Sequence, residues 1–124
     1  MTALFALVLI GCAERTVPEE CVDMCHAATN VFASCLLSWG VQWQSSGYAD
    51  AADYTASCET WAWEMSMLET DAVQREVTHA GVLQASCDDR LTQLTQAQTN
   101  CEVYTQIDWN TPPWVNETTE TNSN

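Results

Sequence analysis

The sequence predicts an all-α fold, a small three-helix up-down-up bundle stapled by disulfides and followed by an irregular C-terminal segment rich in Trp and Pro. Apolar side chains recur at alternating spacings of three and four residues along three stretches, which is the period of one helix face. Gly-, Ser- and Thr-containing clusters between the stretches are typical of turns. Seven cysteines among 124 residues supply the cross-links that small exported domains use.

The chain begins with an apolar run that ends in Leu9-Ile10-Gly11-Cys12. The run has the length of the hydrophobic region of a signal peptide and is far shorter than the roughly 20 residues that span a bilayer. An aliphatic residue, a tolerant position, Gly and then Cys resemble the lipobox of bacterial lipoproteins. The resemblance implies that residues 1–11 are a signal peptide that is removed. It also implies that Cys12 is acylated and becomes the first residue of the mature protein.

The same resemblance implies a location in the bacterial cell envelope. Residues 12–18 would form a lipid-anchored tether that keeps the domain close to the membrane. Ala13 stands where enterobacterial lipoproteins retained in the inner membrane carry Asp, which favours the outer membrane. The alternative for residues 1–12 is a buried apolar element with a core cysteine, but Glu14 and Pro18 make a poor continuation of such an element.

The predicted helical bundle occupies residues 19–107. Pro18 and the acids after it favour a helix start, because proline fits the first turn and acidic side chains complement the helix dipole. The first apolar stripe comprises Cys21, Cys25, Ala28, Phe32, Cys35 and Trp39; Gly40 weakens this helix and Ser45-Ser46-Gly47 ends it. Asp50 is the predicted N-cap of the second helix. Its stripe comprises Ala51, Tyr54, Cys58, Trp61, Met65, Leu68 and Ala72, and we expect Trp39 and Trp61 in the core.

A third helix is predicted after a break at Gly81 and extends to about Thr105. Its apolar positions are Leu83, Cys87, Leu91, Leu94 and Cys101. Residues 108–124 form the Trp/Pro segment and a tail. Pro112 and Pro113 fix extended backbone and exclude a helix interior there. The last nine residues carry no apolar side chain, so we expect them to be disordered.

Six cysteines remain once Cys12 is assigned to lipid, and this even number predicts three disulfides. If the first two helices fold back at Ser46-Gly47, Cys35 and Cys58 lie side by side and form one bond. Keeping the other helices in order favours Cys21–Cys87 and Cys25–Cys101, and the crossed pairing of these four is nearly equal. Zinc is a minor alternative, because the sequence contains no Cys-x-x-Cys pair; we predict no metal site.

One local motif suggests a cofactor. Cys21-x-x-x-Cys25-His26 resembles the haem-attachment sequence of c-type cytochromes, Cys-x-x-Cys-His, with one residue inserted. The resemblance implies a small membrane-anchored cytochrome in which His26 binds the iron and His79 or Met24 supplies the sixth ligand. Such a cytochrome would not need four further cysteines, so structural disulfides are favoured and no cofactor is predicted.

The charge of the chain restricts its partners. Three Arg, no Lys and seventeen Asp and Glu give a net charge of −14. Phosphate backbones would be repelled, which argues against nucleic acid as a partner. A cationic protein or divalent cations are the electrostatically natural partners, but the favoured interpretation is that the charge keeps a tethered protein soluble. The sequence contains two His and no Gly-rich phosphate loop or recognisable nucleophile, so no catalytic activity is predicted.

The candidate partner-binding residues are Trp109, Trp114 and Trp63. The favoured interpretation is that the Trp/Pro segment folds back over Trp63 and closes the end of the bundle. The alternative is an exposed aromatic patch that docks a partner, since Trp is a common hot-spot residue. The expected function is that of a lipid-anchored structural or protein-interaction module, with the membrane and an envelope protein as its partners.

Overall fold

The computed structural model describes residues 17–115. The predictions for the signal peptide (residues 1–11), for acylation of Cys12, for all but the end of the tether (residues 12–18) and for the tail lie outside the described residues. The described range is all-helical and contains no strand. None of its helices combines the length and the apolar character needed to cross a membrane.

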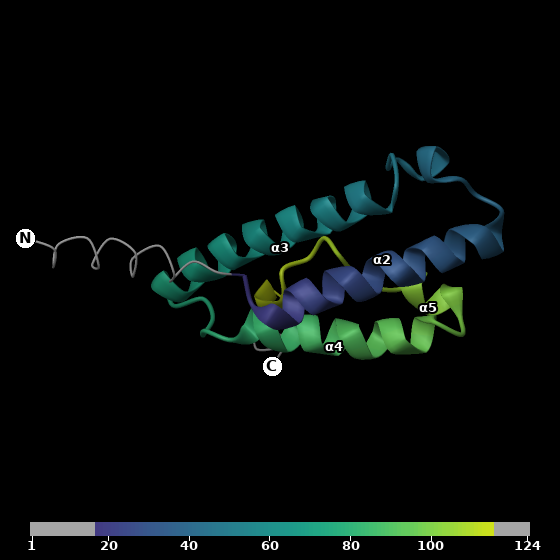
Figure 1. Cartoon of the computed structure of the whole chain (residues 1–124). Coiled ribbons are helices and arrows are strands. Elements are labelled where there is room, and N and C mark those ends of the chain that lie inside the picture. The colour runs from purple at the N-terminus through teal and green to yellow at the C-terminus, as the bar shows by residue number, and fades with distance from the viewer. Residues whose placement is uncertain (1–16, 116–124) are drawn as a thin grey trace, which may run out of the picture.

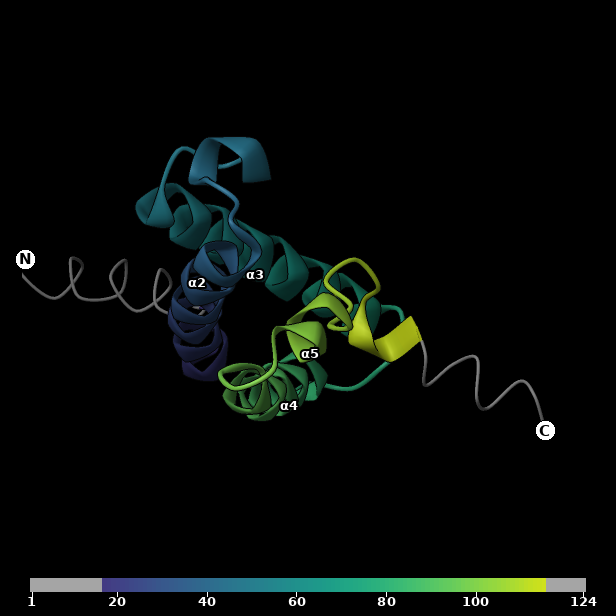
Figure 2. The same cartoon turned by 90° about the vertical axis from the view of Figure 1, so that its right-hand side faces the viewer.

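The helices are α2 (Glu19–Trp39), α3 (Ala51–Gln74), α4 (Val82–Ala97) and α5 (Cys101–Thr105), with a short 3-10 helix, η2 (Trp43–Ser46), between α2 and α3. In Figure 1, α2 crosses the middle of the molecule with α3 along one side and α4 along the other. Contact between α3 and α4 is limited. Figure 2 shows that α5 and the segment after it lie between these two helices. The core is therefore closed by the C-terminal part of the chain.

The starts of α2 and α3 follow the predicted signals, whereas α2 ends at Gly40 and not at the predicted Ser45-Ser46-Gly47. Glu19 and Glu20 form the acidic first turn of α2, and Gly40 ends the helix in the left-handed conformation with φ of 69°. Asp50 caps α3, because its Oδ1 accepts a hydrogen bond from the N–H of Asp53 at 2.8 Å. The Asp53 carboxylate in turn accepts from the N–H of Ala49 at 2.9 Å. This reciprocal capping fixes the start of α3.

The predicted third helix is two helices in the structure. Helix α4 ends at Ala97, and α5 begins after Asn100, whose side chain accepts a hydrogen bond from the N–H of Glu102 at 3.1 Å. An Asn at this position favours a helix start over a helix interior. The first turn of α4 is capped from another helix, because Glu69 of α3 accepts a 2.6 Å hydrogen bond from the N–H of Leu83.

Three disulfides join the helices. Cys21–Cys87 links α2 to α4, as predicted. The predicted bonds Cys35–Cys58 and Cys25–Cys101 are wrong, because Cys25 bonds to Cys58 and Cys35 bonds to Cys101. All six half-cystines lie in or against one hydrophobic core with Met24, Leu83 and Leu94.

The pairing error has its cause in the connection between α2 and α3. This connection turns back along α2, since the rings of Trp43 and Tyr48 pack on Phe32 at centroid distances of 5.6 and 6.1 Å. Helix α3 therefore begins beside the middle of α2, where Thr55 and Thr29 share a 2.7 Å hydrogen bond. Cys58 consequently meets Cys25, about three helical turns earlier in α2 than the predicted partner. The last turns of α2 extend beyond α3 and leave Trp39, expected in the core, 43% exposed.

Candidate functional site

An aromatic cluster forms where α2, α3, α5 and the connection before α3 meet. Phe32 lies at its centre, stacked on Tyr54 at a centroid distance of 4.8 Å and tilted against Tyr104 at 5.3 Å. Trp43 and Tyr48 pack on the same residue from the connection. The cluster thus brings together residues that are far apart in the sequence, and it depends on the observed position of α3 along α2.

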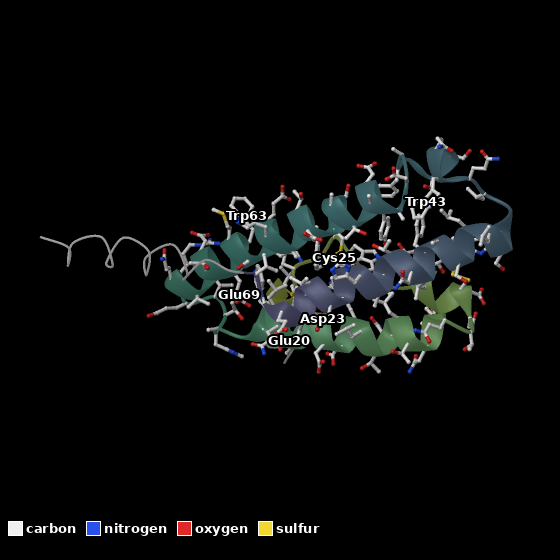
Figure 3. All side chains as sticks on the ribbon, viewed as in Figure 1. Glu20, Asp23, Cys25, Trp43, Trp63 and Glu69 are labelled. Carbon is white, nitrogen blue, oxygen red and sulfur yellow. A yellow bond between two sulfur atoms is a disulfide. The ribbon has the colours of Figure 1, made fainter. Side chains whose placement is uncertain are left out.

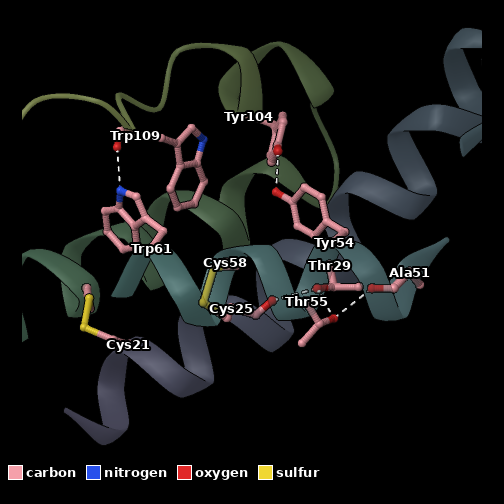
Figure 4. The surroundings of a disulfide bond; sticks show 11 residues. Cys21, Cys25, Thr29, Ala51, Tyr54, Thr55, Cys58, Trp61, Tyr104 and Trp109 are labelled. Atoms are coloured by element: carbon pink, nitrogen blue, oxygen red, sulfur yellow. Dashed lines mark hydrogen bonds between the residues drawn. A yellow bond between two sulfur atoms is a disulfide. The ribbon is translucent and has the colours of Figure 1, made fainter. Parts of the chain in front are cut away.

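A buried phenol and a half-buried phenol form a hydrogen-bonded pair in this cluster. The hydroxyl groups of Tyr54 and Tyr104 share a hydrogen bond that joins α3 to α5 (Figure 4). Burial raises the pKa of Tyr54, and the neighbouring Tyr104 raises it further. Burial also raises the pKa of Tyr104. Both side chains therefore stay uncharged at physiological pH and present hydroxyl groups in an otherwise apolar setting.

A cation supports the other end of the cluster. The Arg90 side chain of α4 lies with its guanidinium carbon 5.0 Å from the ring centroid of Trp61 and 5.6 Å from that of Trp109. The two indole rings meet edge to face, and Trp61 Nε1 donates a 2.7 Å hydrogen bond to the carbonyl of Trp109 (Figure 4). These contacts are cation–π interactions in a desolvated place, where they are strongest. They hold the segment after α5 against α3.

Arg90 also fixes the backbone of that segment. Its Nη2 donates a 2.7 Å hydrogen bond to the carbonyl of Asp108, and the residue is only 7% exposed. Burial lowers the pKa of Arg90, while the Asp108 carboxylate acts in the opposite direction. That carboxylate accepts hydrogen bonds from the N–H groups of Asn110 and Thr111, which lower its own pKa. A buried arginine thus orders the turn that carries Trp109.

A pocket of about 380 Å³ opens among these side chains. Its lining residues are Phe32, Tyr48, Tyr54, Ser57, Cys58, Trp61, Tyr104, Trp109 and Asn110. The volume lies in the range of ligand pockets, roughly 300–1,000 Å³. The lining combines aromatic surface with a few hydroxyl and amide groups and includes no acidic or basic side chain. Its chemistry suits the binding of an apolar or aromatic group, and it offers no acid–base pair for catalysis.

The importance of Arg90 can be measured. We expect Arg90→Ala to lower the free energy of unfolding by about 2 kcal/mol, because a buried charge-assisted hydrogen bond and the contacts with two indole rings are lost. Urea unfolding followed by Trp fluorescence would give the value. Arg75→Ala is the control, since Arg75 forms an exposed ion pair with Asp71 and should change stability by less than about 0.5 kcal/mol. Equal effects of the two changes would contradict the role of Arg90.

The three predicted Trp residues do not share one surface. Trp109 lines the pocket. Trp114 is 6% exposed and packs with Ala72 and Val82, so in this structure it belongs to the core. Trp63 is exposed and lies on a face of α3 turned away from the pocket, because it is two residues beyond Trp61. The segment therefore folds back over Trp61 and the end of α3 and leaves Trp63 uncovered.

The residues proposed for haem are arranged differently from a cytochrome site. Cys21 and Cys25 are buried and bonded to Cys87 and Cys58, so in this structure no thiol at these positions is free to attach haem. His26 is exposed on α2. Within residues 17–115, no three His, Cys, Asp or Glu side chains gather in a way that could hold a metal ion.

Arg90 is not among the site residues predicted from the sequence. A signal for it exists, because Leu83, Cys87, Arg90, Leu94 and Ala97 continue the spacing of four and three residues without a break. An arginine within such a stripe indicates a buried cation that needs partners.

Comparisons of the chain with protein-family models, with curated proteins and with solved structures gave no significant match.

Proposed function

We propose that the protein is a lipid-anchored module of the bacterial cell envelope that binds a partner protein through the aromatic pocket and has no catalytic activity. In this proposal α2, α3 and α4 form an up-down-up scaffold that carries the pocket on one side. The observation that carries the proposal is the pocket itself, whose walls come from segments fixed by Cys25–Cys58 and Cys35–Cys101. A pocket that is ordered before binding loses little conformational entropy on binding.

Two features support the lipid anchor and the envelope location. Residues 9–12 resemble a lipobox, and the three disulfides use six of the seven cysteines, so that Cys12 is the cysteine left over. Disulfides of this density are typical of compartments outside the cytoplasm. Ala13 after Cys12 favours the outer membrane. Acylation at Cys12 would place the pocket in the space next to that membrane.

The charge of the chain supports a basic partner. A net charge of −14 attracts proteins with a basic surface and accelerates their association. Since the pocket lining is uncharged, we propose that the partner inserts one apolar or aromatic side chain there and is attracted through its basic residues by the net negative charge of the chain. High salt should therefore weaken the complex without abolishing the pocket contact.

Filling the pocket tests this proposal. Ser57→Trp should occupy the pocket from its exposed rim and abolish binding, because Ser57 lines it without belonging to the core. Ala56→Trp is the matched control, because Ala56 is exposed on the opposite face of α3. Both variants and the wild type would serve as baits for native envelope extracts, with circular dichroism to confirm folding.

We expect wild type and Ala56→Trp to retain the same envelope protein saturably and Ser57→Trp to lose it. Retention of that protein by a folded Ser57→Trp variant would contradict the pocket as the binding site. A wild-type bait that retains no envelope protein saturably would contradict the interaction module altogether.

A further inference from the structure

A second apolar surface lies away from the aromatic pocket. Trp63 and Met67 are 50% and 51% exposed and stand one helical turn apart on α3. Val17, just before α2, and Val22, in its first turn, line a groove of about 240 Å³ together with Trp63. We call these four residues the anchor-side patch. Figure 3 shows Trp63 at the end of the molecule where α2 begins, far from Trp43 at the other end.

The length of the tether limits where this patch can be. Val17 is five residues after Cys12 in the sequence, and five residues of extended chain span at most about 18 Å. An acyl group on Cys12 would therefore hold Val17, at one edge of the patch, within about 18 Å of the membrane surface. Trp39, of similar exposure, stands at the far end of α2 and lacks this proximity.

We propose that the anchor-side patch is a membrane-contact surface, with Trp63 in the headgroup region of the bilayer that holds the lipid of Cys12. This inference rests on the proposed lipid anchor. Trp is suited to such a place, because its ring is apolar and its N–H group finds hydrogen-bond partners at the interface. The contact would orient the domain as well as tether it.

The orientation follows from α3. Trp61 faces the aromatic pocket, and Trp63, two residues later, faces away from it. Contact of Trp63 with the bilayer therefore turns the pocket away from the membrane, toward the aqueous space where a partner can reach it. The same helix thus separates membrane contact on one face from partner binding on the other.

The surrounding charges select the lipid. Glu59 lines the groove beside Trp63, and Glu64 is exposed next to it, whereas the chain contains no Lys. Anionic headgroups would repel these carboxylates within a Debye length. We therefore assign zwitterionic lipid as the contact, and expect an increasing fraction of anionic lipid to weaken it at low salt.

Fluorescence quenching tests the contact. The full acylated protein is reconstituted into vesicles of phosphatidylcholine with brominated or unbrominated acyl chains, and Trp emission is compared. Bromine quenches only Trp side chains that reach the lipid. We expect brominated chains to quench part of the wild-type emission, Trp63→Phe to remove that quenched part, and the matched control Trp39→Phe to retain it.

The outcomes separate the contact from the anchor. If the protein floats with the vesicles and Trp63→Phe is quenched as much as the wild type, the contact is wrong and the lipid anchor stands. If mass spectrometry finds no acyl group on Cys12 and the protein does not float, the lipid anchor is wrong. The membrane contact, which depends on that anchor, is then wrong as well. Stronger quenching in anionic than in zwitterionic vesicles would overturn the lipid assignment.

Discussion

Replacing Cys35 and Cys101 together by serine is expected to lower the free energy of unfolding by about 4 kcal/mol. This disulfide closes the chain between residues 66 apart in sequence, and a loop of that length strongly restricts the unfolded chain. The bond also holds α5 on α2. Its loss should loosen Tyr104 and open the aromatic pocket. A loss of this size is a large fraction of the stability of a small domain.

Urea unfolding of the oxidised variants measures this effect. Cys12→Ser is the control, because it changes the one cysteine outside the three disulfides and leaves these bonds in place. A loss below about 1 kcal/mol for the double variant would contradict the role of the bond. A peptide map after cleavage at aspartates and aromatic residues checks the pairing itself, since cleavage after Phe32 separates Cys25 from Cys35. A peptide that links Cys35 to Cys58 would contradict the structure.

Trp114→Ala is expected to lower the free energy of unfolding by about 3 kcal/mol, as large-to-small changes at buried Trp residues do. The side chain is buried against Ala72 at the end of α3 and Val82 at the start of α4. Its removal would leave a cavity where the C-terminal segment joins these two helices. A loss of this size is expected of a core residue and not of a docking residue on the surface.

The matched control for Trp114 is Trp63→Ala, which removes the same side chain from an exposed position. In aqueous solution we expect it to lower stability by about 1 kcal/mol, because half of the Trp63 side chain is already exposed to water. Thermal and urea unfolding of both variants would give the comparison. Similar losses for the two changes, or none for Trp114→Ala, would contradict the observed placement of these residues.

The sequence predicted what depends on local signals. The helix-start signals of Pro18 and Asp50 place the starts of α2 and α3 at their observed bounds, whereas α2 ends at Gly40, before the predicted end at Ser45-Ser46-Gly47. These signals act over one turn of helix, so they do not depend on the rest of the fold. The same holds for the all-helical class, because the apolar period of each stretch is a property of that stretch alone.

The sequence did not predict what depends on tertiary packing. The position of α3 along α2 is set by Trp43 and Tyr48, which pack back on Phe32. The local sequence contains no signal that predicts this contact. The disulfide register follows from this position, and so does the pocket, whose walls come from four separate parts of the chain. Arg90 is the exception, because a cation within an apolar stripe of the sequence indicates a buried charge.

The lipid anchor is the claim on which the location, the orientation and the membrane contact of this protein all depend. Intact mass spectrometry of the protein extracted from envelope membranes without reduction tests it most directly. We expect a chain that begins at an acylated Cys12, lacks residues 1–11 and contains no free thiol. A soluble protein that retains Met1, with Cys12 unmodified, would contradict it.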